Sequence, residues 1–448
     1  MQGARISVVG AGSTNFSLEL VKDICLTPSL AGSTISFMDI DQKRLDAVHT
    51  LASRYAKEMK IDLKLEKTTE RRRSLQDADF VINLALVVGH KGYTKVWDMA
   101  RKRGYRFGGS YHVMHDEGFW INFYQFRLFE SIVEDVLEVC PNAWYIQLAN
   151  PVLAATTYLR RKYPKLNFVG MCEGPRSIYT MSEVFGLDPG KISFEMPGVN
   201  HFVWLTRYYS DGEDALPVID SWIRKNGKRY WRSQTPSTKL GPVALDLYDR
   251  FGVFPIGDTC TPGGGSWPWW YHEDTEKEKR WGEDPEWWWR RELGDLDSRG
   301  SELDKLLNLS APISDVILPE KSRQFTVPFI ESVMRDIPRV LPLNVLNTNG
   351  SLPGVPDNFD VEVPCLVTSH GVQGQRSSGL PSSLVGYILR DRVAPVETEL
   401  EAYQKGDRDK LLELLMMDPW TKSEGQASGL MKDVFADRSF SEMAKHYT

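Results

Sequence analysis

The sequence predicts an α/β protein with a Rossmann-type parallel sheet, followed by a mixed α+β domain. Two observations favour this class. Short β-branched runs alternate with helical stretches through about the first 200 residues, and a glycine-rich turn follows the first of those runs. Strands that alternate with helices form parallel sheets with right-handed crossovers. We therefore expect a first domain over residues 1–198 and a second domain over residues 199–448.

The elements of the first domain follow from the spacing of apolar residues. Apolar runs between turn residues predict buried strands, and apolar residues three or four apart predict helices. The expected strands are 4–9, 34–38, 80–85, 143–148 and 167–171, and the expected helices are 16–26, 41–59 and 120–139. The alternation weakens after residue 200, where only a strand at 360–368 and a long helical stretch at 380–416 stand out.

Residues with useful chemistry follow several of the predicted strands. They are Gly10, Asp39, Asn83, Asn150 and Cys172. Ligands of open α/β sheets bind at the carboxyl ends of the strands. We therefore expect a functional site at the edge of the sheet that these residues share.

Composition and charge exclude several classes of protein. The formal net charge of −6 provides no basic surface for nucleic acid. No apolar run reaches the roughly 18 residues of a membrane helix, and the first residues lack the pattern of a signal peptide. The five cysteines show no zinc-ribbon or redox spacing, so most are expected to be reduced core residues. We expect a cytoplasmic protein without nucleic-acid or membrane partners.

A nucleotide site is predicted by the pattern Gly10-x-Gly12-x-x-Asn15, which follows the first strand and opens the first helix. The first glycine permits the tight turn, and the second lets the backbone approach a pyrophosphate at the helix N-terminus. Asn15 replaces the third glycine, so the fingerprint is incomplete, and an ordinary turn without a ligand is the alternative. Asp39 or Asp41 would bind the ribose hydroxyls and favour NAD over NADP. The expected cofactor-binding residues are Gly10, Gly12, Ser13, Asn15, Asp39, Asp41 and Asn83.

A second group of candidate residues lies in the middle of the chain. Cys172 and His201 come just after predicted strands, and a thiolate with an imidazole suits a divalent transition metal. Taken singly, each residue is more often part of a core. Glu173 adds a carboxyl group beside Cys172. Asp258 is a candidate base, and a helix cap or turn residue is the alternative for it.

Several short strings together resemble glycoside hydrolase family 4, most closely its members that act on unphosphorylated α-glucosides and α-glycuronides. The strings are Gly10-Ala11-Gly12-Ser13, Asp39-Ile40-Asp41, Asn150-Pro151, Gly170-Met171-Cys172, Gly198-Val199-Asn200-His201 and Ile256-Gly257-Asp258-Thr259. The similarity extends to Arg390-x-Arg392 and to the segment that begins at Asp418, so nearly the whole chain is covered. Each string is short, but their order and spacing are specific.

The resemblance implies an unusual hydrolysis. NAD⁺ takes hydride from C3 of the sugar, a base removes the acidified C2 proton, and the aglycone leaves C1 by elimination. Water then adds and the cofactor returns its hydride, an exception to the two-carboxylate scheme. A divalent metal, manganese in most of the family, polarises the C2 and C3 oxygens.

The resemblance also implies roles for residues of this chain. Cys172 and His201 would hold the metal, and Asp258 would be the C2 base, with Tyr271 as its substitute. Asn150 and Asn200 would contact the sugar. The remaining expectations are a small-molecule glycoside as substrate and assembly into a homodimer or homotetramer.

Two segments depart from the family pattern. Glu173 stands where close relatives have His and other members have Asp, so it could serve as the leaving-group acid, and metal dependence becomes uncertain. Residues 108–116 replace a string of the Arg-Gly-Ile-Asp type, and Asp116 and Asn122 are partial replacements in the substrate region.

Two further features bear on the substrate. Arg176, and Arg376 in a glycine-rich loop, would suit a carboxylate or sulfonate, which favours a uronide or sulfosugar. Solvated loop arginines are the alternative. Seven of the 14 tryptophans fall between residues 267 and 289, which fits a sugar-stacking or subunit surface and equally fits core packing.

Two other functions remain as alternatives. An NAD-dependent dehydrogenase of the lactate/malate type shares the same sheet, but it would need a His/Asp proton relay and an Arg for a 2-hydroxy acid, and these residues do not come together in the first 200 positions or so. A non-catalytic NAD- or sugar-binding protein is the second alternative. Cys172, His201 and Asp258 count against it.

Overall fold

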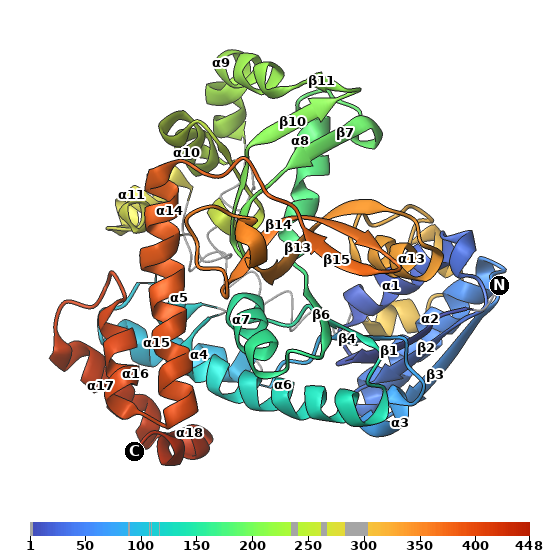
Figure 1. The fold of residues 1–448 in the computed structure, drawn as a ribbon, viewed down its shortest axis with the longest axis horizontal. Coiled ribbons are helices and arrows are strands. Elements are labelled where there is room, and N and C mark those ends of the chain that lie inside the picture. Colours follow the sequence, from blue (N-terminus) through green and yellow to red (C-terminus); the bar gives the residue numbers. More distant parts are fainter. Residues whose placement is uncertain are drawn as a thin grey trace.

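The computed structural model describes residues 3–87, 90–106, 108, 110–115, 117–233, 241–260, 267–282 and 303–448. Its centre is one large sheet with the strand order β12-β9-β8-β14-β13-β6-β5-β4-β1-β2-β3, and β15 pairs with β14. Figure 1 shows the sheet between helices, with the N-terminal strands at the right and the C-terminal helices at the lower left.

The N-terminal half of the sheet is parallel, as predicted. Its strands are β1 (Arg5–Val9), β2 (Ser33–Met38), β3 (Leu63–Thr68), β4 (Phe80–Asn83), β5 (Trp144–Gln147) and β6 (Asn167–Gly170). Five of the six fall at predicted strands. The prediction missed β3 because four of the six residues in its sequence LKLEKT are polar and all six are half-buried or exposed at the sheet edge.

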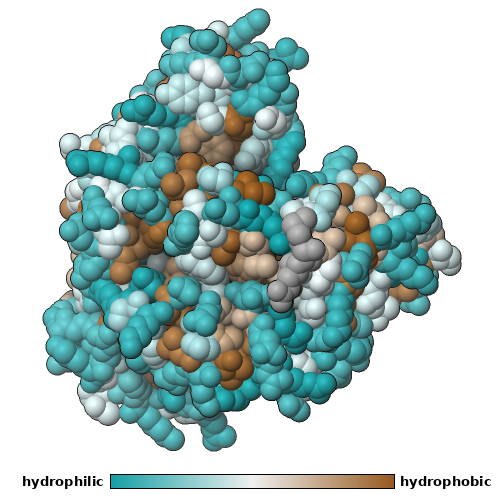
Figure 2. All heavy atoms as spheres, turned by 45° about the vertical axis from the view of Figure 1, so that its right-hand side comes forward, coloured by the Kyte–Doolittle hydropathy of each residue, from teal (hydrophilic) through white to brown (hydrophobic). Residues whose placement is uncertain are grey.

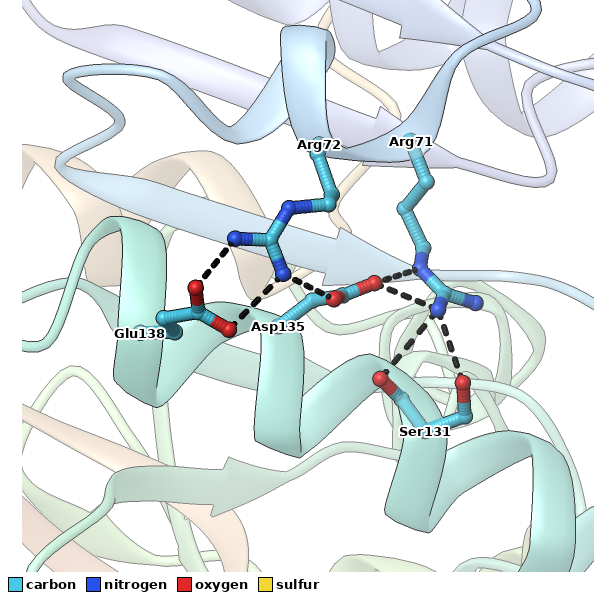
Figure 3. A network of polar contacts seen from close by, with 5 residues as sticks. All are labelled: Arg71, Arg72, Ser131, Asp135 and Glu138. Carbon is cyan, nitrogen blue, oxygen red and sulfur yellow. Dashed lines mark hydrogen bonds and ion pairs between the residues drawn. The ribbon is translucent and has the colours of Figure 1, made fainter.

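Helices cross over between these strands. They are α1 (Thr14–Cys25), α2 (Gln42–Glu58), α3 (Arg71–Leu75), α4 (His90–Lys102), α5 (Tyr111–Met114), α6 (Phe119–Val139) and α7 (Val152–Lys162). The predicted helices correspond to α1, α2 and α6. Arg71 and Arg72 of α3 point at α6, where they bind Ser131, Asp135 and Glu138, as Figure 3 shows. This contact joins the two crossovers that flank β4.

The C-terminal half extends the same sheet with antiparallel strands. They are β8 (Gly198–Val199), β9 (Phe202–Leu205), β12 (Phe254–Ile256), β13 (Arg339–Leu346), β14 (Asp360–Thr368) and β15 (Gly371–Gly374). The junction is a single register pair, Asn344 with Gly170 of β6. The fold class is therefore confirmed as a mixed sheet that begins as a Rossmann-type unit, while the domain division at residue 198 stays a prediction.

A second, three-stranded sheet lies apart from the large one. It has the order β11 (Glu213–Asp214), β10 (Arg207–Ser210) and β7 (Ile192–Glu195). Around it and the large sheet are α8 (Ser177–Val184), α9 (Leu216–Ser233), α10 (Pro242–Phe251), α11 (Thr275–Trp281) and α13 (Thr326–Arg335). Figure 1 places this sheet and α9 at the top.

The predicted helical stretch at 380–416 is several helices. They are α14 (Ser382–Ile388), a π-helical turn η8 (Leu389–Val393), α15 (Ala394–Lys405) and α16 (Arg408–Met416), followed by α17 (Glu424–Ala436) and α18 (Ser441–His446). Gly406 ends α15 in the left-handed conformation with a φ of 65°, and the Asp407 side chain caps α16. The helical prediction was right in kind, and these two residues explain the break.

Apolar side chains gather near the middle of the face shown in Figure 2, and the rim of that face is mostly hydrophilic. In the part of the chain that the structure describes, no helix is both long and apolar enough to cross a membrane.

Candidate active site

The glycine-rich turn after β1 has the geometry of a nucleotide site. Gly10 has a φ of 85°, and a Cβ added there would lie 2.6 Å from the backbone nitrogen of Ala85. A Cβ on Gly12 would lie 2.7 Å from the Asp39 carboxylate, which accepts a hydrogen bond from the Gly12 N–H. Gly10 therefore requires glycine, and a side chain at Gly12 would displace the Asp39 carboxylate. The backbone between the two glycines can approach a ligand closely.

The other predicted cofactor residues fall into two groups. Ser13 and Asn15 are exposed at the start of α1, where a pyrophosphate would bind. Asp39 contacts the glycine turn, whereas Asp41 caps α2 through the Arg44 N–H. The structure thus favours Asp39 over Asp41 as the acid beside the cofactor.

Asn83 lies at the carboxyl end of β4, but its side chain points into the sheet. Its Nδ2 donates to the Tyr145 hydroxyl at 2.8 Å and to Gln147 Oε1 at 3.1 Å. Its Oδ1 accepts from the backbone of Ala85 at 3.1 Å. Asn83 therefore fixes the loop that faces Gly10.

Exposed apolar side chains surround the glycine turn. Ile40 is 89% exposed after β2, and Leu86 and Val87 are 40% and 48% exposed after β4. Apolar residues in such positions commonly line ligand sites. Together with Gly10 and Gly12, they fit an adenine dinucleotide lying across the ends of β1, β2 and β4.

A compact group of three ligand atoms lies at the end of β6. The Cys172, His201 and Asp258 ligand atoms are all within 4.8 Å of one another, and His201 Nε2 is 3.7 Å from Asp258 Oδ2. Sulfur, nitrogen and oxygen ligands bind transition metals at about 2.0–2.3 Å, so one ion can reach all three. The residues present therefore fit a divalent metal, and the sequence prediction correctly brought all three together.

Two glycines permit this approach. Cys172 and Asp258 belong to different segments, which touch through the backbones of Gly174 and Gly257. A Cβ on Gly257, whose φ is 61°, would lie 2.8 Å from the Gly174 Cα. The Thr259 hydroxyl then joins the second segment to β9, because it bonds both the N–H and the carbonyl of Val203.

His201 has an unusual backbone conformation. It is a non-glycine residue with a φ of 59°, and it is only 6% exposed. Such left-handed residues cost free energy and are often retained at functional sites. His201 lies in the tight turn between β8 and β9, and its left-handed conformation holds its ring at the cluster.

Behind the three-residue cluster lies a buried polar layer. The Asn200 amide donates to Glu362 at 3.4 Å, and Asn344 is opposite Glu362 in the β13–β14 register. Burial, together with the nearby Asp258, raises the pKa of the Glu362 carboxyl to about 7, although hydrogen bonds from Asn200 and Asn344 act in the opposite direction. Asn200, predicted to contact the sugar, is fully buried and belongs to this layer.

One aromatic pair beside the cluster was not predicted. The buried His115 ring contacts the His201 ring at a centroid distance of 6.2 Å, and it stacks on Tyr111 at 5.4 Å. The sequence analysis identified residues 108–116 as a departure from the family pattern, but the candidate residues taken from this region were Asp116 and Asn122. Asp116 lies outside the described residues, and the Asn122 amide binds Glu399 within the core. The sequence signal that could have identified His115 is the pair of histidines, His112 and His115, just after Gly108 and Gly109.

Glu173 points toward a different set of partners. Its carboxylate accepts from Gln324 at 2.7 Å and lies 3.6 Å from the Arg176 guanidinium, which also pairs with Glu19 at 3.4 Å. Glu173, Arg176 and Gln324 border a small cavity that Cys172 also lines. Arg176 is thus engaged by two carboxylates, and Glu173 lies beside the cluster without belonging to it.

The remaining predicted residues have different surroundings. The Tyr271 hydroxyl donates to Asp246, and burial and that carboxylate raise the pKa of the phenol. Asn150 follows β5, and its carbonyl accepts from Gln125 at 2.8 Å. Arg376 is exposed in the loop after β15. Of the two candidate bases, only Asp258 belongs to the cluster.

The tryptophan-rich stretch is mostly packing, as far as the structure describes it. Trp267 is 3% exposed and contacts Phe202 and Trp204, and Trp270 and Trp281 are half-buried. Trp269 is exposed. The three tryptophans at 287–289 lie outside the described residues.

Comparisons with known families agree with this site. The profile described as "Family 4 glycosyl hydrolase" matches residues 5–185, and that of the "Family 4 glycosyl hydrolase C-terminal domain" matches residues 196–421. The chain belongs to glycosyl hydrolase family 4. The family resemblance and the glycosidase activity expected from the sequence are therefore confirmed, and the dehydrogenase alternative is less supported.

Individual members of the family are distant from the chain. An α-galactosidase from Bacillus subtilis (strain 168) is 24% identical, and the alignment covers 96% of both chains. An α-galacturonidase from Thermoanaerobacterium saccharolyticum is 26% identical and covers 96% of this chain and 94% of its own.

Solved structures show the same fold. The 6-phospho-β-glucosidase from Thermotoga maritima, solved with manganese, NAD⁺ and glucose-6-phosphate, has a TM-score of 0.78 at 19% identity and covers 99% of both chains. A malate dehydrogenase from Cryptosporidium parvum gives 0.51 at 15% identity, over 90% of this chain and 99% of its own. The predicted likeness of the fold to lactate/malate dehydrogenases is confirmed by this match.

Proposed function

We propose that this glycosidase uses NAD and a divalent metal to open the glycosidic bond through a transient oxidation of the sugar. One observation carries the proposal. The cluster of Cys172, His201 and Asp258 lies at the end of β6, on the same edge of the sheet as the glycine-rich turn after β1. A sugar at that edge would meet both the nicotinamide and the metal ligands.

The bound groups would supply two kinds of chemistry. NAD accepts and returns a hydride at C3, and a divalent ion polarises neighbouring sugar oxygens. Cys172 and His201 are the residues that would hold the ion, and manganese is the metal we expect. Gly10, Gly12 and Asp39 would hold the dinucleotide, with Ser13 and Asn15 at the pyrophosphate.

The remaining steps belong to side chains of this protein. Asp258 would remove the C2 proton, because its carboxylate lies beside the groups that would hold the C2 and C3 oxygens. Glu173 would protonate the departing oxygen from the cavity beside Cys172. Asn150 would contact a sugar hydroxyl. Tyr271 is the weaker candidate for the base, since its hydroxyl is buried and bonded to Asp246.

The substrate and the assembly remain proposals. Relatives are named for galactosides, galacturonides and phosphorylated glucosides. We propose an unphosphorylated glycoside with an acidic sugar, a uronide or a sulfosugar. The homodimer or homotetramer and the cytoplasmic location also stay predictions.

The cofactor requirement tests this function directly. The protein is incubated with NAD⁺, manganese and a panel of 4-nitrophenyl glycosides, with and without a chelator. We expect release of nitrophenol that requires NAD⁺ and proceeds without net accumulation of NADH. Stoichiometric NADH would instead identify a dehydrogenase, and binding without turnover would identify a non-catalytic protein.

A further inference from the structure

Arg392 is a buried cation with an unused hydrogen-bonding edge. It lies in the π-helical turn η8 and is 1% exposed. Its Nη1 donates to the carbonyl of Asp391 at 3.0 Å. Its Nε and Nη2 are buried and have no hydrogen-bond partner among the residues that the structure describes. Burying an arginine in this way is costly unless an anion or another acceptor completes it.

The two unused nitrogens determine which ligand fits. Nε and Nη2 form one side of the planar guanidinium, and this side presents two parallel N–H groups. That fork matches the two oxygens of a carboxylate or a sulfonate. The guanidinium also lies 3.7 Å from the centroid of the Tyr111 ring. The face of the ring stabilises the positive charge of Arg392, but it does not accept a hydrogen bond from the Nε and Nη2 edge of the guanidinium.

The nearby carboxyl groups act on Arg392 from a distance and, among the described residues, do not pair with it. Asp391 is held by Arg390 through two contacts of 2.6 and 2.8 Å. Asp418 accepts from Ser110 and from the Trp420 N–H, and Glu117 lies within electrostatic range of Arg392. In the described part of the chain, none of the three forms an ion pair with Arg392. A hollow lined by Arg392, Tyr111, Trp269 and Asp418 gives access to this region.

Arg392 is close to the candidate active site. Its guanidinium is 5.6 Å from the centroid of Phe202, the residue after His201. Tyr111, under the guanidinium, stacks on His115, which in turn contacts His201. A chain of ring contacts therefore runs from Arg392 through Tyr111 and His115 to His201. In a pyranose, C5 and its C6 substituent lie across the ring from C2 and C3.

We propose that Arg392 binds the acidic group of the substrate, a carboxylate or sulfonate at C6 of the sugar. The proposal rests on the proposed function, because it takes the cluster of Cys172, His201 and Asp258 as the site of C2 and C3. It also takes the place of Arg176 and Arg376, the two arginines that the sequence offered as candidates for an anion. Arg176 is paired with Glu19 and Glu173, and Arg376 is exposed.

The test compares matched neutral and acidic glycosides. Wild type, Arg392→Gln, Arg392→Lys and the control Arg390→Gln are assayed with NAD⁺ and manganese. The substrates are 4-nitrophenyl glucosides, glucuronides, galactosides and galacturonides of both anomers. The control removes an exposed guanidinium two residues away, which pairs with Asp391 and lies over Tyr387.

We expect wild type to prefer the acidic member of a pair. Arg392→Gln should lower kcat/KM for that glycoside by about 100-fold or more, chiefly through KM, because a desolvated anion loses its partner. Activity on the neutral glycoside should change by less than about 3-fold, which also shows that the variant is folded. Arg392→Lys should recover only part of the loss, and Arg390→Gln should behave as wild type.

Two other results would overturn the proposal. Equal losses on neutral and acidic glycosides would make Arg392 a structural residue. Stabilisation of wild type by inorganic sulfate, lost in Arg392→Gln but without any preference between glycosides, would assign the site to a free anion.

A binding measurement separates this proposal from the proposed function. Glucuronate, galacturonate and the neutral sugars are titrated into the NAD-loaded protein by calorimetry. Tighter binding of the acids that disappears in Arg392→Gln supports the proposal even when no glycoside is hydrolysed. Hydrolysis that does not need NAD⁺ would instead refute the proposed function alone.

Discussion

Gly257 and Gly174 touch backbone to backbone, and a Cβ added to Gly257 would come within 2.8 Å of the Gly174 Cα. This contact brings Asp258 next to Cys172. It makes the metal-ligand cluster depend on two glycines that carry no chemistry themselves.

Gly257→Ala should therefore damage the cluster. The new methyl group must displace the backbone of one segment, so we expect a loss of manganese affinity of at least about 10-fold, as when supporting contacts of a metal site are removed. Gly252→Ala is the matched control, because Gly252 has a similar φ of 68° and no atom within 4 Å of the added Cβ. Both variants should lose thermal stability because of the positive φ, and Gly257→Ala should lose more because of its backbone clash. Equal manganese affinity in both would contradict the account.

The substitution Asp258→Asn distinguishes two roles of this carboxylate, the C2 base and a third metal ligand. Removal of a general base lowers kcat by about 10²–10⁴-fold. If Asp258 is the base, manganese affinity measured by electron paramagnetic resonance should stay close to wild type, whereas Cys172→Ser should weaken it strongly. A large loss of affinity in Asp258→Asn would make the carboxylate a third metal ligand and would leave the base to another residue.

Glu173→Gln should make the reaction sensitive to the leaving group. If Glu173 protonates the departing oxygen, alkyl glycosides should lose about 10²-fold or more in kcat, while 4-nitrophenyl glycosides, which leave readily, should lose little. Glu183→Gln is the control, since Glu183 is an exposed carboxylate that pairs with Arg323. A uniform loss for all leaving groups would exclude the acid role.

The buried carboxyl group of Asp418 should make the free energy of unfolding depend on pH. Burial raises the pKa of its carboxyl from 3.8 to about 7. The folded state then binds a proton that the unfolded state releases above about pH 4, so this contribution is complete below that pH and is lost as the pH rises through 7. Its upper limit is about 4 kcal/mol, at about 1.4 kcal/mol per pKa unit.

Asp418→Asn should flatten that part of the stability profile. Urea unfolding of wild type and variant at several pH values between 4 and 8 measures the effect. Asp433→Asn should not flatten it, because the Arg103 guanidinium lowers the pKa of Asp433. A variant with the same decline between pH 4 and 7 as wild type would show that Asp418 does not titrate in this range.

The sequence predicted the parallel half of the fold well, and the structure brings its candidate residues Cys172, His201 and Asp258 together, for identifiable reasons. Buried strands such as Phe80–Asn83 are continuous apolar runs, and parallel topology gathers their ends at one edge. Cys172, His201 and Asp258 lie close to strand ends, so their convergence follows from topology together with the family resemblance. The antiparallel half has no such regular pattern, and β13 was missed for that reason.

The surroundings of individual side chains were not predictable. Asn83 occupies its expected strand end and Asn200 was expected to contact the sugar, but both amides are used inside the core. Arg176 was expected to meet an anionic substrate and instead pairs with two carboxylates of its own chain. Arg392 is buried although its sequence position is an ordinary helical one. Such outcomes depend on tertiary partners that spacing along the chain does not reveal.

The most direct test of the central claim follows the proton at C2. The enzyme is allowed to hydrolyse a glycoside in deuterated water with NAD⁺ and manganese, and the released sugar is examined by NMR. Oxidation at C3 followed by elimination predicts deuterium at C2 of the product. A product without deuterium at C2, formed at full rate and without NAD⁺, would contradict the account.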